Sequence, residues 1–151
     1  MKFHRILVAV DGGEADREAI ELACRLVRET KGKVYVVHII EVKRSLPLGA
    51  ELQTDAEEGE RILRRAEDCA DQCNCRIETD LLQAREPGPA IVTEVIEKQI
   101  DVVLMGMSYR TRFGHFEIGE TIPYILKNAP CRVLVFRQPI NGQGMPGGDE
   151  T

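Results

Sequence analysis

Four short runs of apolar and β-branched residues stand out along the chain, at residues 6–10, 34–40, 102–105 and 133–136. Nearly unbroken apolar runs of this length are typical of strands covered on both faces, as in a parallel sheet. A fifth run at residues 76–84 alternates apolar and polar positions, which favours a more exposed edge strand. The pattern therefore predicts a five-stranded parallel sheet.

Between these runs the apolar residues recur three and four positions apart, which is the spacing of an amphipathic helix. Four such segments lie at residues 19–27, 62–73, 91–96 and 122–126. Strands that alternate with helices form a doubly wound α/β sandwich, because each right-handed crossover packs its helix on one face of the sheet. In such sheets a ligand binds beyond the carboxyl ends of the strands, where the winding reverses.

The composition is that of one globular domain, with 43% hydrophobic and 30% charged residues in a chain of 151. We expect this domain to span residues 1–140. Residues 141–151 are polar and rich in glycine, and they predict a disordered tail. Residues 43–54 form one long predicted loop, whose length favours a functional or mobile segment such as a lid.

Charge and hydropathy limit the partners that the chain is expected to have. The formal net charge of −5 argues against a large nucleic-acid footprint, which needs a concentrated basic face. No apolar run approaches the roughly 20 residues of a membrane-spanning helix, so we expect no direct membrane insertion. The first residues lack the apolar core of a signal peptide, so we expect a cytoplasmic protein.

The five cysteines do not have the spacing of a secreted disulfide framework. Cys69, Cys73 and Cys75 are close enough in sequence to be considered as three metal ligands. However, Cys69 and Cys73 also continue the apolar stripe of a predicted helix, and free cysteine is among the most buried residue types. We therefore predict ordinary thiols and no bound metal.

Polar and glycine residues mark the ends of two neighbouring strands. Asp11 follows the first strand, and Gly12 and Gly13 permit a tight turn, after which Glu14 or Asp16 caps the next helix. The fourth strand ends in "LMGM", which brings Gly106 to the same edge of the sheet. We expect Asp11 and Gly106 to lie close together.

Catalytic residues are not evident in the sequence. His38 lies in an apolar strand and is interpreted as a hydrogen-bonded core histidine rather than a base or a ligand. Ser108, Thr111 and His115 share one loop, but no carboxylate at a recognisable spacing accompanies them, so a nucleophile triad is not expected. The chain is therefore not predicted to be an enzyme.

Four segments together resemble the universal stress protein family, and the resemblance extends from Phe3 to Arg137. "RILVAVDGG" resembles its first strand and Asp turn, "VYVVHII" its second strand, and "IDVVLMGM" its fourth. "IPYILKNAPCRVLVFR" resembles its closing helix, Ala-Pro turn and fifth strand. The resemblance implies a Rossmann-like, adenine nucleotide alpha hydrolase-like fold, a homodimer, and in some members a site for ATP or AMP.

The nucleotide-binding members carry G-x2-G-x9-G-[ST], in which backbone N–H groups and a hydroxyl bind the phosphates. Matched to this pattern, Gly106 and Gly119 stand at the first and third glycines. Tyr109 replaces the second glycine and Glu120 replaces the hydroxyl residue, followed by Thr121. Half of the pattern is therefore changed.

The phosphate end leaves two interpretations open. In the first, Tyr109 crowds the site and the Glu120 carboxylate accepts the free N–H groups at a helix start, so that it takes the place of a phosphate. In the second, Arg110 and Arg112 bind phosphate from another direction, or pair with Glu120.

The base and ribose end matches the family more closely. The resemblance assigns it to Ala9, Asp11, Ile39 and Met105. The alternative is that Asp11 is only a turn residue and that Ile39 and Met105 belong to the core.

Three classes of function remain. The first is a dimeric regulatory protein of the universal stress type that binds an adenine nucleotide. The second is an interaction module without nucleotide, such as a regulator or cytosolic domain of a membrane transporter, which "RTRFG" resembles. The third and weakest is a slow nucleotide hydrolase. We predict the dimer contact at Val133, Leu134, Val135 and Phe136, an apolar edge with no internal Lys or Pro to prevent aggregation.

Overall fold

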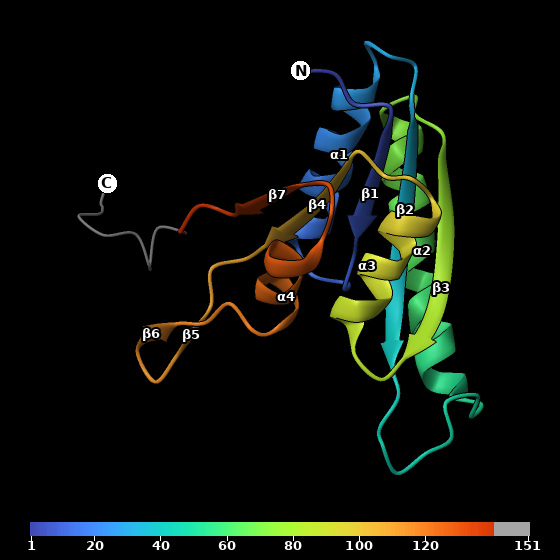
Figure 1. Ribbon diagram of the computed structural model, residues 1–151, viewed down its shortest axis with the longest axis vertical. Helices are drawn as coiled ribbons and strands as arrows, with labels where there is room; N and C mark the ends of the chain where they lie inside the picture. Colours follow the sequence, from blue (N-terminus) through green and yellow to red (C-terminus); the bar gives the residue numbers. More distant parts are fainter. Residues whose placement is uncertain (141–151) are drawn as a thin grey trace.

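A computed structural model describes residues 1–140 of the chain (Figure 1). The predicted tail at residues 141–151 lies outside the described residues. The strands are β1 (Arg5–Ala9), β2 (Lys33–Glu41), β3 (Ile77–Ala84), β4 (Val102–Met107), β5 (Thr111–Arg112), β6 (His115–Phe116) and β7 (Arg132–Arg137). The helices are α1 (Ala15–Val27), α2 (Gln53–Gln72), α3 (Pro87–Glu97) and α4 (Thr121–Asn128).

Five strands form one parallel sheet in the order β3-β2-β1-β4-β7. Leu7 of β1 pairs with Tyr35 of β2 on one side and with Val103 of β4 on the other. The winding therefore reverses between β1 and β4. The predicted doubly wound α/β class with a five-stranded parallel sheet is confirmed.

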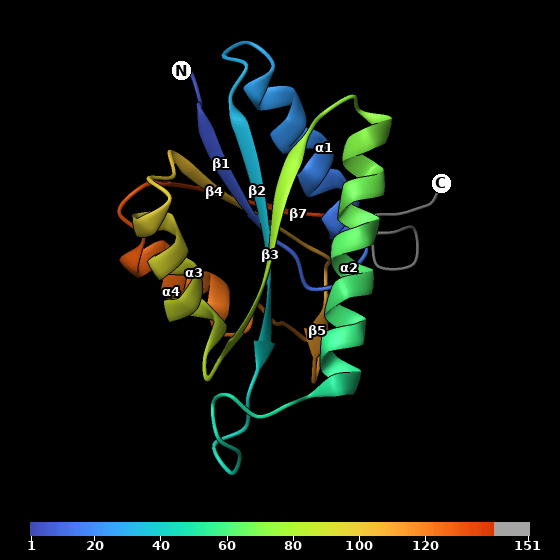
Figure 2. The same cartoon turned by 90° about the vertical axis from the view of Figure 1, so that its right-hand side faces the viewer.

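Helices cover both faces of the sheet, with α1 and α2 on one face and α3 and α4 on the other (Figure 2). Ile6 and Val8 of β1 point into the first core with α1 and α2, whereas Leu7 points into the second core with α3 and α4. This alternation explains the unbroken apolar runs, because successive side chains of a strand face opposite layers and both layers are buried. Among residues 1–140, no helix is long and apolar enough to cross a membrane.

The segment between β4 and α4 contains a hairpin, β5–β6, that the sequence pattern did not predict. Thr111 pairs with Phe116 and Arg112 with His115, so only Phe113 and Gly114 form the turn. Both have positive φ, 53° and 78°. In Figure 1 the hairpin projects away from the main sheet.

The loop between β2 and α2 is attached to the β3 side of the sheet. The side-chain amide of Gln83 donates to the carbonyl oxygens of Leu48 at 2.9 Å and Ala50 at 3.1 Å. None of residues 43–54 lines the cavity at the β1–β4 reversal point described below. The prediction that residues 43–54 form a lid over that cavity is therefore not supported by any contact in this structure.

Candidate functional site at the strand ends

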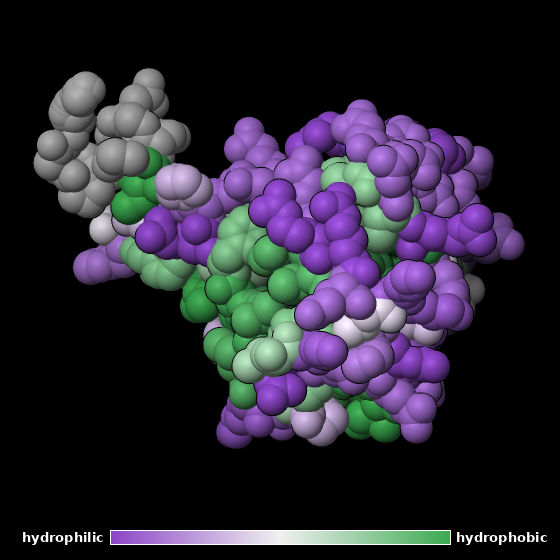
Figure 3. Space-filling model, turned by 90° about the horizontal axis from the view of Figure 1, so that it is seen from above, coloured by the Kyte–Doolittle hydropathy of each residue, from purple (hydrophilic) through white to green (hydrophobic). Residues whose placement is uncertain are grey.

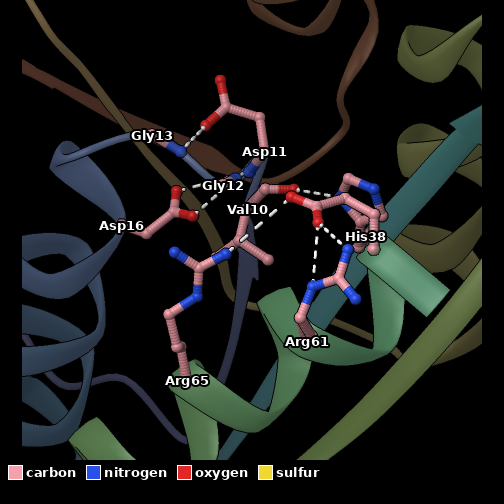
Figure 4. Close-up of polar contacts among 9 residues, drawn as sticks. Val10, Asp11, Gly12, Gly13, Asp16, His38, Arg61 and Arg65 are labelled. Atoms are coloured by element: carbon pink, nitrogen blue, oxygen red, sulfur yellow. Dashed lines mark hydrogen bonds and ion pairs between the residues drawn. The ribbon is translucent and has the colours of Figure 1, made fainter. Parts of the chain in front are cut away.

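The turn after β1 is held together by two carboxylates (Figure 4). The Asp16 carboxylate accepts hydrogen bonds from the backbone N–H groups of Asp11 at 3.3 Å and Gly12 at 2.8 Å. The Asp11 carboxylate accepts one from the N–H of Gly13 at 2.8 Å. Gly12 has a φ of 89°, a conformation that favours glycine. Of the two predicted capping residues, Glu14 makes no side-chain cap bond and Asp16 supports the turn.

Burial raises the pKa of Asp16 to about 6, and the nearby negative charge of Asp11 adds to this effect. The two backbone hydrogen bonds and His38 oppose the rise. Desolvation therefore outweighs the hydrogen bonds to the ionised form. The pKa of Asp16 thus lies near 6, which could not be predicted from the sequence because its cause is the packing around the turn.

His38 lies in the second half of β2, beside this turn. Its Nδ1 is 2.9 Å from the carbonyl oxygen of Val10, so the ring donates Nδ1–H to that oxygen. This bond confirms the interpretation of His38 as a hydrogen-bonded histidine. Gly59 of α2 packs against the ring, since a Cβ at this position would lie 3.2 Å from His38 Cδ2. Helix α2 therefore closes over this part of β2.

Two arginines of α2 approach the same region (Figure 4). Arg61 donates to the Glu58 carboxylate, and this hydrogen bond lowers the pKa of Glu58. Arg65 lies 3.9 Å from the same carboxylate and lines a separate cavity of about 470 Å³ between α1 and α2. These side chains were not predicted as part of a site, because the periodicity of a helix does not show what its polar face approaches.

A cavity of about 230 Å³ lies at the carboxyl ends of β1, β2 and β4, next to the start of α4. Nine of the ten residues predicted for the nucleotide site line it. They are Ala9, Asp11, Ile39, Met105, Gly106, Arg110, Gly119, Glu120 and Thr121. Arg112 does not line it and instead pairs with Glu117 at 3.6 Å in the hairpin. Asp11 and Gly106 border the same cavity, as expected for strand ends that meet at one edge.

The two glycines of the motif are required for different reasons. A Cβ on Gly106 would lie 2.8 Å from Phe136 Cζ and 3.0 Å from the carbonyl oxygen of Ala15. Gly106 is therefore explained by packing alone. Gly119 has open space around it but a φ of 76°, which turns the chain into α4. Neither observation by itself requires a phosphate.

Tyr109 and Glu120 differ from their predicted roles. The Tyr109 ring is absent from the cavity lining and stacks on Phe116 with 5.4 Å between ring centroids. The prediction that Tyr109 crowds the site is therefore wrong, because the hairpin takes up the ring. Glu120 lines the cavity but makes no side-chain cap bond to α4 in the described chain, so its carboxylate does not occupy the N–H groups of the helix start.

The remaining candidates lie apart from the cavity. Cys69 of α2 is buried in the core, and Cys73 and Cys75 pack partly buried against that core. Within residues 1–140, no group of three or more metal-binding side chains is arranged to hold an ion. Thr111 and His115 lie in the hairpin opposite Phe116 and Arg112, not opposite each other. The prediction of ordinary thiols awaits metal analysis.

Fold and cavity together define a doubly wound α/β domain with a small-ligand cavity at the point where the sheet reverses its winding. A family model described as "Universal stress protein family" matches residues 2–137. The chain belongs to the universal stress protein family.

Individual relatives agree with this assignment. Universal stress protein MJ0531 of Methanocaldococcus jannaschii is 27% identical over 143 residues, which cover 91% of this chain and 84% of that protein. The solved universal stress protein of Archaeoglobus fulgidus in complex with dAMP has a TM-score of 0.71 at 23% identity, covering 89% of this chain and 98% of that one. A family protein of Arabidopsis thaliana with AMP bound has a TM-score of 0.64 at 17% identity, covering 95% and 97%.

Proposed function

We propose that this protein is a regulatory protein that binds an adenine nucleotide, preferably a monophosphate, in the cavity at the β1–β4 reversal point. The observation that carries the proposal is the cavity itself, which gathers predicted base, ribose and phosphate residues from four separate segments. Structural neighbours are described as complexes with dAMP and with AMP. The proposed activity is binding, without catalysis.

The apolar end of the cavity suits an adenine base. Ala9, Ile39 and Met105 line it, and apolar walls with a few polar groups are typical of small-molecule sites. The Asp11 side chain stands at the rim, where a carboxylate accepts hydrogen bonds from ribose hydroxyls. Since the Asp11 carboxylate already accepts one bond from Gly13, its position is fixed before a ligand arrives.

The other end favours one phosphate over three. A volume of about 230 Å³ is below the 300–1,000 Å³ usual for ligand pockets. Glu120 places a negative charge where the outer phosphates of ATP extend, whereas Arg110 supplies one guanidinium at the same end. The first N–H groups of α4 are not capped by Glu120 and suit a single phosphate.

Calorimetric titration with AMP, ATP and cyclic AMP tests the proposal. We expect the wild type to bind AMP more tightly than ATP. Glu120→Ser removes the repulsion and adds a hydroxyl, so it should strengthen ATP binding by about tenfold and AMP binding by less, because a charge-assisted hydrogen bond contributes roughly 1.5–3 kcal/mol. Glu97→Ser, at an exposed position of α3, is the control. Tight ATP binding by the wild type, or no binding of any of the three, contradicts the proposal.

We further propose a homodimer through the exposed edge of β7. Leu134 of β7 is 38% exposed and Leu126 of the neighbouring α4 is 55% exposed. Seen from above, apolar side chains gather in an area on the side of the molecule where β7 lies, while much of the rest is polar (Figure 3). An apolar edge strand next to an apolar patch is typical of a surface that is covered in solution.

A second candidate function is supported by the β5–β6 hairpin. Its exposed aromatic and arginine residues are typical of protein contacts, and such a contact is what an interaction module requires. One example of such an interaction module is a cytoplasmic protein that regulates a membrane transporter. Co-purification of an adenine nucleotide with the protein would favour the first function, and a nucleotide-free protein that associates with a partner would favour the second.

A further inference from the structure

The turn of the β5–β6 hairpin holds a residue that does not suit its position. Two-residue hairpin turns with positive φ at both positions strongly favour Asn, Asp or Gly. Here the first position is Phe113, with a φ of 53° and 87% of its surface exposed. A bulky side chain in this conformation is strained, and an exposed phenyl ring loses contact with any core. Stability of the isolated chain therefore does not explain Phe113.

The hairpin presents this ring on an ordered support. Phe116 of β6 stacks on Tyr109, and the guanidinium of Arg137 lies 5.1 Å from the centre of the Tyr109 ring. The N–H of Glu117 donates to the carbonyl oxygen of Arg110 at 3.0 Å and closes the base of the hairpin. An ordered aromatic tip loses little conformational entropy when it binds, which favours a docking role.

The charge of the tip is opposite to that of the whole chain. Residues 109–116 contain Arg110 and Arg112 and no carboxylate, whereas the chain has 20 basic and 25 acidic residues. Glu117, which follows β6, approaches Arg112 at 3.6 Å in an exposed ion pair that docking would exchange for one with the partner copy. The Arg112 guanidinium lies 5.4 Å from the centre of the Phe113 ring, so charge and ring are presented together. The tip therefore suits an apolar surface with an acidic rim.

The same chain carries a surface of that kind. A groove of about 330 Å³ lies between the end of β2 and the starts of α3 and α4, and we call it the acidic groove. Pro87, Pro89 and Tyr124 give it apolar walls, and Glu41, Glu86 and Glu120 give it negative charge. No Lys or Arg is among its lining residues in the described part of the chain, although Arg44 approaches Glu86 at 3.6 Å from outside the lining.

We propose that the hairpin tip of one copy docks into the acidic groove of a second copy. Phe113 packs on the prolines and Tyr124, and the Arg112 guanidinium meets Glu86 on the rim. When each copy offers its tip to the other, the two contacts are related by a two-fold axis and the assembly closes. This contact is separate from the edge of β7 and forms without a bound nucleotide.

Two other possible partners of the hairpin tip fit the charges of this chain less well. An anionic lipid surface attracts the two arginines but repels a protein of net charge −5. An unrelated acidic protein fits the tip, but it leaves the acidic groove of this chain without a counterpart. The second copy satisfies both surfaces at once.

A charge-exchange experiment tests the contact with nucleotide-free protein in sedimentation velocity, at concentrations on the order of 100 μM. Arg112→Glu and Glu86→Arg each place like charges in both contacts, so each variant alone should associate about tenfold more weakly than the wild type. An equimolar mixture of the two variants has opposite charges in both contacts and should recover the association. Pairing through β7 contributes equally to all samples, because neither residue lies in that strand.

Phe113→Asn provides an independent measurement, since Asn suits the turn and the fold should be retained. It should lose the association while circular dichroism stays unchanged. Added salt should weaken the wild-type association, because its charges are near the surface. The proposal is overturned if the wild type shows no association beyond the β7 pairing, if the folded variants associate as the wild type does, or if the mixture does not recover what each variant lost.

Discussion

Asp16 connects the start of α1 to the turn that carries Asp11, and it does so with a partly buried carboxylate. Its bonds to the N–H groups of Asp11 and Gly12 require a lone-pair acceptor, which either protonation state supplies. Burial and the negative charge of Asp11 nevertheless make ionisation of Asp16 less favourable in the folded protein than in the unfolded chain. The turn next to the cavity is therefore sensitive to pH near 6.

The sign of this effect gives the first prediction. The pKa of Asp16 rises from 3.8 to about 6 on folding, so the folded state binds the proton more tightly. The contribution of protonated Asp16 to the stability of the folded state is fully present below about pH 4 and is lost as the pH rises through 6. Relative to Asp16→Asn, the wild type should lose on the order of 1 kcal/mol of unfolding free energy between these pH values, after allowance for partial solvent screening.

Urea unfolding at a series of pH values measures that difference. Asp55→Asn, at an exposed position in the first turn of α2, is the matched control and should follow the wild type. If the unfolding free energies of the wild type and Asp16→Asn change in parallel with pH, the Asp16 carboxylate does not destabilise the folded protein as the pH rises.

Gly106 gives the second prediction, which separates packing from ligand binding. Alanine at this position requires movement of the Phe136 ring or of the backbone of α1, so Gly106→Ala should cost about 1–3 kcal/mol of stability in protein without nucleotide. Gly49→Ala has open space around the new Cβ and should be nearly neutral. Equal unfolding midpoints for the two variants in thermal denaturation would contradict a packing role.

At the scale of elements, the main strands and helices were predictable because their apolar periodicity reflects burial on two layers. The hairpin was not, since Phe-Gly is not a usual turn pair and strands of two residues leave no periodicity. The position of the Tyr109 ring was predicted wrongly for the same reason, because the hairpin that holds it was not predicted. A motif position fixes the place of a residue along the chain, but the stacking on Phe116 decides where the ring points.

The candidate cavity was more predictable than the hairpin, for a topological reason. Residues such as Ala9, Ile39 and Met105 lie in the last three positions of parallel strands, whose carboxyl ends meet at one edge of the sheet. Arg112 was misassigned because it was only near this edge in sequence, and the hairpin carries it to Glu117.

The hairpin gives the third prediction. Phe113→Asn replaces a strained aromatic residue with one that favours the turn, so it should stabilise the protein by roughly 0.5–1 kcal/mol. Phe116→Asn removes a ring that stacks on Tyr109 and should destabilise the protein instead. Differential scanning calorimetry measures both, and a lower melting temperature for Phe113→Asn would mean that the ring supports the fold.

At the scale of the whole molecule, the sheet ends in two different edges. Strand β3 is an edge without a fully buried residue, in line with the predicted more exposed edge strand, and β7 is the second edge. Leu134 of β7 and Leu126 of α4 are exposed at this second edge, which is why the proposed dimer uses it.

The fourth prediction tests that dimer. Leu134→Lys puts a charge at the centre of the proposed edge contact and should shift the protein toward the monomer in sedimentation at micromolar concentration. Leu48→Lys is the control, because Leu48 is 49% exposed in the loop between β2 and α2, away from β7. A wild type that sediments as a monomer, or a Leu134→Lys variant that remains a dimer, contradicts the β7 contact.

Gly119 and Glu120 line both the cavity at the strand ends and the acidic groove. One short piece of backbone is thus a wall common to two sites, and a change of its position alters both. Thermodynamic reciprocity then applies: a ligand that makes docking at the groove tighter by some factor must itself bind tighter, by the same factor, once the groove is filled. In two copies joined in this way, the ligand occupancy of one copy would therefore change the ligand affinity of the other.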